Sequence, residues 1–177
     1  MRKVVFYGAV SLDGYLAAKN DSLEWLFATD LAGASTYEAF EKQVTTMVMG
    51  RITYEEVLKL MATQPLYPGK EKVVFSHRAR EKMEEVTFVA DDPIAVVRKL
   101  QQQEDPGWIW IVGGGGLLTE LIAGDLIDEY WIQIAPVLLG AGKPLFPAGN
   151  YRRRLEYVET TQMGELVELH YRKPKES

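Results

Sequence analysis

The stretch WIWIVGGGGLL, residues 108–118, joins an uninterrupted apolar segment to four consecutive glycines and the start of an apolar helix. Continuous apolar residues over 108–112 are typical of a strand that is buried on both faces in the middle of a parallel sheet. The glycines at 113–116 leave backbone N–H groups open to a ligand, and a helix N-terminus adds unpaired donors and partial positive charge. A tight strand-to-helix turn needs only one glycine, so four in succession favour a phosphate or pyrophosphate site.

Strand and helix patterns alternate on both sides of this stretch. Apolar residues at 54, 57, 58 and 61 have the spacing of an amphipathic helix, and Asp92 followed by Pro93 is typical of a helix start. Further short strands are predicted from the apolar runs at residues 4–7, 47–49, 73–75, 86–90 and 130–135. This alternation predicts a parallel sheet with helices on both of its faces.

The end of the chain has a different pattern. Residues 155–161 and 166–172 are predicted to form an antiparallel hairpin, with Val167, Leu169 and Tyr171 on its buried face. We therefore predict an α/β fold with three layers, α/β/α, in which the central sheet is mostly parallel and carries a C-terminal antiparallel hairpin.

The composition excludes several classes of protein. Apolar residues make up 47% of the 177 residues, which argues against a disordered chain and suits a single domain over residues 1–177. Because 25 acidic residues outnumber 20 basic ones, giving a net charge of −5, we expect no nucleic-acid partner. There is no cysteine, and the two histidines lie far apart in the sequence, so no metal site is expected. The lack of a signal-peptide pattern and of a long uncharged stretch predicts a cytoplasmic protein with no membrane partner.

Two other strand ends carry groups that suit an anionic ligand. Gly50 would allow close approach, Arg51 offers a planar guanidinium group, and Thr53 offers a hydroxyl group in the same helical turn. Ser76 and His77 follow the strand predicted next along the chain. Each set alone could be a solvated turn. Ligands of parallel sheets bind beyond the carboxyl ends of the strands, so three compatible strand ends predict one common site.

These residues belong to motifs that resemble the dihydrofolate reductase superfamily. The motifs are SLDGYLA at residues 11–17, VMGRITYE at 48–55 and IVGGG at 111–115. Within that superfamily, LIDE at 126–129 and IAPVLLGAGKPLF at 134–146 resemble the reductase domain of bacterial riboflavin biosynthesis, the RibD C-terminal domain, and its stand-alone relatives. The segment LEWL, residues 23–26, is also similar to those relatives. The motifs follow the family order over nearly the whole chain.

The resemblance implies a dihydrofolate reductase-like fold, NADPH as cofactor, a small-molecule substrate and a homodimer. Gly50, Arg51 and Thr53 would hold the cofactor phosphates, and the glycines at 113–116 would hold the pyrophosphate. The adenosine 2′-phosphate would lie near Ser76 and His77, and the nicotinamide beside Ala9 and Leu16. The positions that match the family's cofactor site are Ala9, Leu16, Gly50, Arg51, Thr53, Ser76, His77, Gly113, Gly114, Gly115, Gly116, Leu117 and Leu118.

Two positions depart from the family pattern. Thr36 stands where dihydrofolate reductases place a carboxylate, which argues against direct reduction of a folate. Gly116 stands where the family often has a basic residue, so the charge for a 2′-phosphate would come from Arg51, Arg78 or Arg80. The preference for NADPH over NADH therefore stays open at this point.

Three functions are compatible with the sequence. The first is an NADPH-dependent reductase of the riboflavin-biosynthesis type, similar to 5-amino-6-(5-phosphoribosylamino)uracil reductase, acting on a small imine or carbonyl substrate. The alternatives are a dihydrofolate reductase acting on a pterin and a nucleotide-binding module without turnover. Asp13 is the candidate catalytic residue, although it could simply be a turn residue. Trp25 and Tyr37 are candidate substrate-binding residues, although aromatic side chains are more often core.

Overall fold

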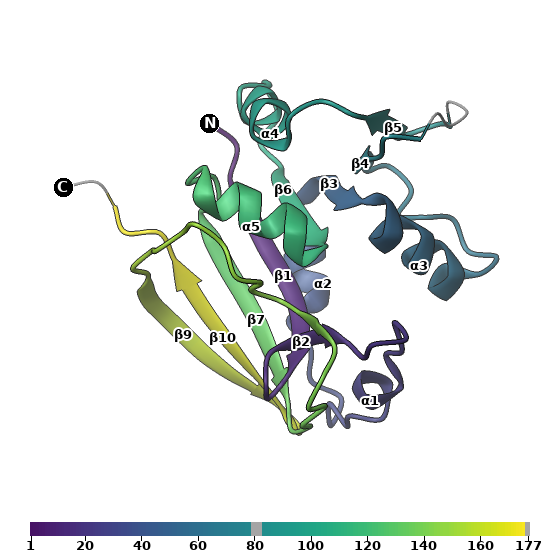
Figure 1. Ribbon diagram of the computed structural model, residues 1–177, viewed down its shortest axis with the longest axis vertical. Coiled ribbons are helices and arrows are strands. Elements are labelled where there is room, and N and C mark those ends of the chain that lie inside the picture. The colour runs from purple at the N-terminus through teal and green to yellow at the C-terminus, as the bar shows by residue number, and fades with distance from the viewer. Residues whose placement is uncertain (79–82, 176–177) are drawn as a thin grey trace.

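An eight-stranded sheet, ordered β5-β4-β3-β6-β1-β7-β10-β9, forms the frame of the protein (Figure 1). The computed structural model describes residues 1–78 and 83–175. The strands of this sheet are β1 (Val4–Ser11), β3 (Val44–Gly50), β4 (Glu71–Phe75), β5 (Val86–Val89), β6 (Trp108–Gly113), β7 (Glu129–Ala135), β9 (Glu156–Met163) and β10 (Leu166–Arg172). A separate two-stranded sheet pairs β2 (Tyr15–Ala17) with β8 (Lys143–Pro144).

The direction of the strands confirms the predicted fold class. Neighbouring strands from β5 to β7 run parallel, whereas β10 is antiparallel to both β7 and β9. Helices α4 (Pro93–Gln101) and α5 (Gly115–Ala123) cover one face of the sheet, and α2 (Tyr37–Glu41) and α3 (Arg51–Met61) cover the other. Figure 1 shows α5 in front of β1 and α2 behind it. The remaining helix, α1 (Glu24–Phe27), lies in the connection between β2 and β3.

Alternating side chains of the central strands build the two cores. In β1, Val4 and Phe6 pack with α4 and α5, whereas Val5 and Tyr7 pack on the side of α2 and α3. Strand β6 contributes to both cores, as its continuous apolar sequence predicts. The start of α4 is also as predicted, because the Asp92 carboxylate accepts the N–H of Ala95 at 2.8 Å.

Strands β1 and β6 pair only over their first residues. The register runs from Val4 opposite Ile109 to Phe6 opposite Ile111. Beyond that point β1 continues to Ser11 paired with β7, and β6 continues to Gly113 paired with β3. The carboxyl ends of the two central strands therefore separate, which is where parallel sheets commonly bind ligands.

The predicted buried face of the C-terminal hairpin was wrong in part. Glu168 and His170 are buried on β10, whereas Val167 is 37% exposed. The cause is the neighbouring strand, because Glu168 lies opposite Gln133 and His170 opposite Trp131 on the face shared with α2. Polar partners on β7 and in the cover of this face make burial of these two side chains acceptable.

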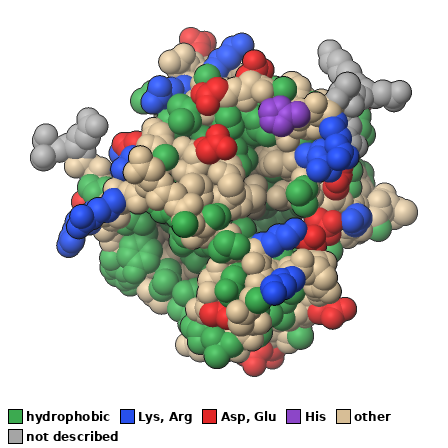
Figure 2. Space-filling view, viewed as in Figure 1, with side chains coloured by type: hydrophobic (Ala, Val, Ile, Leu, Met, Phe, Trp, Pro, Cys, Tyr) green, Lys and Arg blue, Asp and Glu red, His purple; other side chains and the backbone are tan. Residues whose placement is uncertain are grey.

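Charged side chains of both signs are interspersed on the face shown in Figure 2. None of the helices in the described part of the chain has the length and apolar character needed to cross a membrane. Over residues 1–78 and 83–175, no three His, Asp or Glu side chains come together in a way that could hold a metal ion.

We predict that Leu121→Ala lowers the free energy of unfolding by about 2–5 kcal/mol, because it leaves a cavity in the core beneath α5. Urea denaturation measures the change. Leu138→Ala is the control, since Leu138 is 71% exposed and its loss should cost less than about 0.5 kcal/mol. Equal effects of the two substitutions would contradict the assignment of the core.

Candidate functional site

The glycines after β6 form a bare backbone turn at the start of α5. Gly114 has φ of 98°, a conformation that favours glycine, and no side chain caps the helix that follows. A side chain on Gly116 would meet no atom of the protein within 4 Å, so this position faces open space. Gly115 differs, because a Cβ there would lie 2.5 Å from the Pro144 carbonyl oxygen. The turn thus presents unpaired N–H groups of the first helical turn to the exterior.

The start of α3 lies beside this turn. Gly50 is the N-cap of α3, it has no side-chain cap, and a Cβ on it would also meet open space. The Thr53 side chain lies 3.7 Å from the positions that Cβ atoms on Gly113 and Gly114 would occupy. Two helix N-termini with positive partial charge therefore converge around Thr53, which is a favourable arrangement for an anion.

Arg51 and the residues that follow β4 lie near these two turns. Arg51 is half-buried and its guanidinium group donates to the Glu55 carboxylate at 2.8 Å. Phe75 is the register partner of Gly50, so Ser76 and His77 lie one strand away from the α3 start. Ser76 is held by the Val89 carbonyl at 2.8 Å and its hydroxyl group accepts the Arg78 N–H at 3.1 Å.

The other predicted cofactor residues differ in how deeply their side chains are buried. Leu117 and Leu118 are buried in the core, so only their backbone faces the turn, and the Leu118 N–H is already used by the Gly114 carbonyl. Ala9 and Leu16 are half-buried, Ala9 on the part of β1 beyond the β6 pairing. Arg80, a candidate for the 2′-phosphate charge, lies outside the described residues.

Asp13 holds two loops together. Its carboxylate accepts hydrogen bonds from the Ser11 hydroxyl at 2.6 Å and from the backbone N–H groups of Leu139 and Gly140 at 3.1 and 2.7 Å. These donors, the Ser11 hydroxyl above all, lower the pKa of Asp13 below its ordinary value of 3.8. Asp13 is therefore an ionised clamp at neutral pH. Its direct part in catalysis stays a prediction that these contacts do not support.

A second polar cluster lies on the α2 side of the sheet, and no sequence motif predicts it. The Glu168 carboxylate accepts the Thr36 hydroxyl at 2.7 Å and the Gln133 amide at 2.8 Å, both on Oε2. The Tyr7 hydroxyl lies 3.1 Å from Thr36 Oγ1. Burial raises the pKa of Tyr7, so its hydroxyl group stays protonated at neutral pH. Thr36, where the family resemblance predicted the loss of a carboxylate, thus has a carboxylate bound to it from β10.

Trp25 and Tyr37 each pack on residues that adjoin this cluster. Trp25 packs against Ala135, Met163 and Leu166, while the Tyr37 ring lies 6.0 Å from the Tyr7 ring. Burial strongly raises the pKa of Tyr37. Both positions are compatible with a substrate wall and with a purely structural role.

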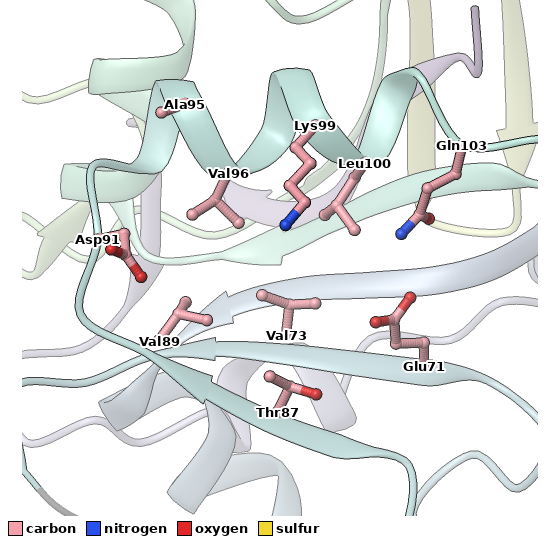
Figure 3. A pocket seen from close by; sticks show the side chains of 10 residues that line it. All are labelled: Glu71, Val73, Thr87, Val89, Asp91, Ala95, Val96, Lys99, Leu100 and Gln103. Carbon is pink, nitrogen blue, oxygen red and sulfur yellow. The ribbon is translucent and has the colours of Figure 1, made fainter.

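A separate groove of about 410 Å³ lies between α4 and strands β4 and β5 (Figure 3). Val96, Lys99 and Leu100 of α4 point toward Val73 of β4 and Val89 of β5. None of the sequence-predicted site residues lines it. The groove is therefore distinct from the glycine turns.

The chain belongs to the RibD C-terminal domain family, whose family model matches residues 2–169. This is a reductase-type family with the dihydrofolate reductase-like fold. The family was predicted from the motifs, and that prediction is confirmed.

Three individual proteins illustrate the similarity. YwjB of Bacillus subtilis (strain 168), a protein of uncharacterised function, is 38% identical over 173 residues, which cover 96% of this chain and 97% of YwjB. A structure from Shewanella sp. PV-4 that carries the provisional name of a riboflavin biosynthesis protein is 28% identical, with a TM-score of 0.85 over 99% of this chain and 100% of that one. Dihydrofolate reductase from Enterococcus faecalis, solved with NADP(H), is 18% identical, with a TM-score of 0.65 over 98% of this chain and 97% of that one. At this lower identity the likeness concerns the fold alone.

The Asp13 clamp predicts a pH-dependent difference between wild type and Asp13→Asn. Because the folded-state pKa is lowered, the stabilisation by Asp13 is present above its unfolded value of 3.8 and is lost as pH falls through the lower folded value. Wild type should therefore melt at a higher temperature than Asp13→Asn at about pH 7, and the gap should narrow toward about pH 3.

Asp91→Asn is the matched control, since no described residue donates a hydrogen bond to Asp91, and it should change the melting temperature little at either pH. A gap between wild type and Asp13→Asn that is constant with pH would contradict the clamp.

Proposed function

We propose that the protein is an NADPH-dependent reductase of the riboflavin-biosynthesis type that reduces a small imine or carbonyl compound. The observation that carries the proposal is the convergence of two uncapped helix N-termini, those of α3 and α5, around Thr53. Membership of the RibD C-terminal domain family supports the same activity. The NADP(H) in the Enterococcus faecalis dihydrofolate reductase, which shares the fold, is a further reason to test this cofactor.

The residues around the turns fit the anionic bridge of a dinucleotide. The N–H groups of Gly115 and Gly116 are the donors available at the start of α5, and Gly50 gives equal access to the start of α3. Thr53 adds a hydroxyl group between the two turns. Arg51 supplies positive charge while remaining paired with Glu55. The space beside both turns is open to a ligand, because a Cβ atom added to Gly50 or Gly116 would meet no other atom within 4 Å.

The nicotinamide end would lie where β1 and β6 separate. Ala9 has a small side chain at this point and leaves room for a flat ring above the strand. The loop after β1 is fastened by Asp13 to residues 139 and 140, so it can close the site while keeping its shape. NADPH, when bound, supplies hydride to the substrate carbon. The protein positions the two partners and excludes water from them.

NADPH binding is the first expected outcome. At 100 times its Kd, NADPH should stabilise the wild-type protein by about 2.7 kcal/mol in thermal melts, with less stabilisation by NADH at the same concentration. Gly116→Val should abolish the shift in melting temperature. The valine side chain would fill the space proposed for the ligand, and its Cβ would meet no protein atom within 4 Å.

Glu120→Val is the matched control on the same helix, because Glu120 is exposed one helical turn beyond Gly116, and it should keep the shift. If Gly116→Val left the NADPH affinity unchanged, the turn at the start of α5 would not be part of the cofactor site.

Turnover separates the reductase from a nucleotide-binding module. We expect wild type to oxidise NADPH in the presence of a cyclic or sugar-derived imine. The decrease in nicotinamide absorbance measures this oxidation. Gly116→Val should lose this activity together with NADPH binding. NADPH binding without oxidation across imine, carbonyl and pterin compounds would contradict the proposed enzyme activity.

A further inference from the structure

Glu168 is a buried carboxylate without a cation. The residue is 1% exposed, and no Lys, Arg or His of the described chain forms an ion pair with it. The neighbouring His170 is engaged elsewhere, its Nε2 lying 2.9 Å from the Glu129 carboxylate. Burying a carboxylate is costly unless opposite charge or several hydrogen bonds compensate. Two neutral donors leave this negative charge only partly compensated, so the site is suited to a positively charged ligand.

The hydrogen bonds around Glu168 have a defined direction. The Thr36 hydroxyl has one hydrogen, which it donates to Glu168, so at the 3.1 Å contact Tyr7 must donate to Thr36. Gln133 donates its amide N–H to the same carboxylate oxygen, Oε2. No described residue donates to the other oxygen, Oε1. The network therefore fixes the carboxylate in place and leaves one acceptor oxygen for a ligand.

The register of three strands places this carboxylate in line with the nicotinamide position. Gln133 of β7 is the register partner of both Ala9 of β1 and Glu168 of β10. Residues paired in this way lie side by side on one face of the sheet, about 10 Å apart across two strand spacings. A substrate ring stacked on a nicotinamide above Ala9 would thus have its far edge directed along the row toward Glu168.

The α1 part of the cover over this row is thinly packed. Helix α1 buries none of its residues, whereas α2 is held by Phe40, whose ring stacks on that of Tyr7 with the centroids 4.2 Å apart. Trp25 and Leu31 rest on the small cluster of Ala135, Met163 and Leu166. Segments with few buried contacts open at low free-energy cost, so a small molecule can reach the row when this cover moves outward.

We propose that Glu168 is the anionic anchor of the substrate pocket and selects a substrate with a protonated C=N nitrogen. The proposal rests on the proposed reductase function for the hydride step. There, the carboxylate stabilises the iminium form, hydride adds to the carbon, and the C=N π pair becomes the nitrogen lone pair. Cation and hydride give a neutral amine, so charge and atoms balance. A neutral ketone directs a lone pair at Glu168 and is disfavoured.

Two ring-matched probes test the anchor. The 2-aminopyridinium ion offers a ring N–H donor and a positive charge, whereas 2-pyridone has the same shape and a ring N–H but no charge. We expect wild type to bind 2-aminopyridinium at least about tenfold more tightly than 2-pyridone in tryptophan-fluorescence titrations at mildly acidic pH. Glu168→Gln, nearly identical in shape, should remove this preference. Equal binding of the probes by wild type, or a preference retained in Glu168→Gln, would overturn the proposal.

A second measurement covers the case in which Glu168→Gln does not fold. In wild type, NMR should detect a nuclear Overhauser effect between 2-aminopyridinium protons and the Thr36 methyl group, and its absence at saturating probe would overturn the proposal. NADPH affinity is measured in parallel. If the protein prefers 2-aminopyridinium but does not bind NADPH, the result would support the Glu168 anchor and refute the proposed function. NADPH binding without that preference would refute the anchor alone.

Discussion

The burial of β6 on both faces is the constraint on which the site depends. Ile109 and Ile111 are needed by one core and Trp110 by the other, so the strand has no freedom to shift, and its end at Gly113 is fixed in space. The indole of Trp110 also donates to the Tyr7 carbonyl at 3.0 Å, close to the point where the ladder between β1 and β6 ends. A rigid strand that stops at bare glycines places the uncapped start of α5 beside that of α3. The anion-binding character of the site follows from this placement.

The sequence predicts this half of the molecule well because the evidence is local. An apolar run followed by glycines specifies a buried strand and a close-approach turn, and the Asp92-Pro93 pair marks a helix start, without knowledge of the rest of the chain. The short elements α1, α2 and β2 were not predicted, since three to five residues give too few positions for a periodic pattern. Leu117 and Leu118 match the family motif, yet their side chains serve the core.

The Glu168 cluster could not be predicted because it depends on pairing between distant strands. Alternation of apolar and polar residues in β10 placed Glu168 on the exposed face, and only the register with Gln133 reverses this. Thr36 looked like the loss of an acidic group, but the carboxylate bound to it comes from the far end of the chain. A single acidic residue in an alternating strand carries no local signal of such a role. One half of the candidate site is therefore predictable from a local motif, whereas the other half depends on how distant strands pair.

The central claim is that the backbone N–H groups at the start of α5 bind the phosphates of NADPH. NMR of uniformly ¹⁵N-labelled protein tests it most directly, by following the amide resonances of Gly114, Gly115 and Gly116 during titration with NADPH. The account predicts that these resonances shift more than those of residues lining the groove between α4 and β5, with a smaller response to nicotinamide mononucleotide, which lacks the pyrophosphate bridge. Unchanged glycine resonances in the presence of bound NADPH would contradict it.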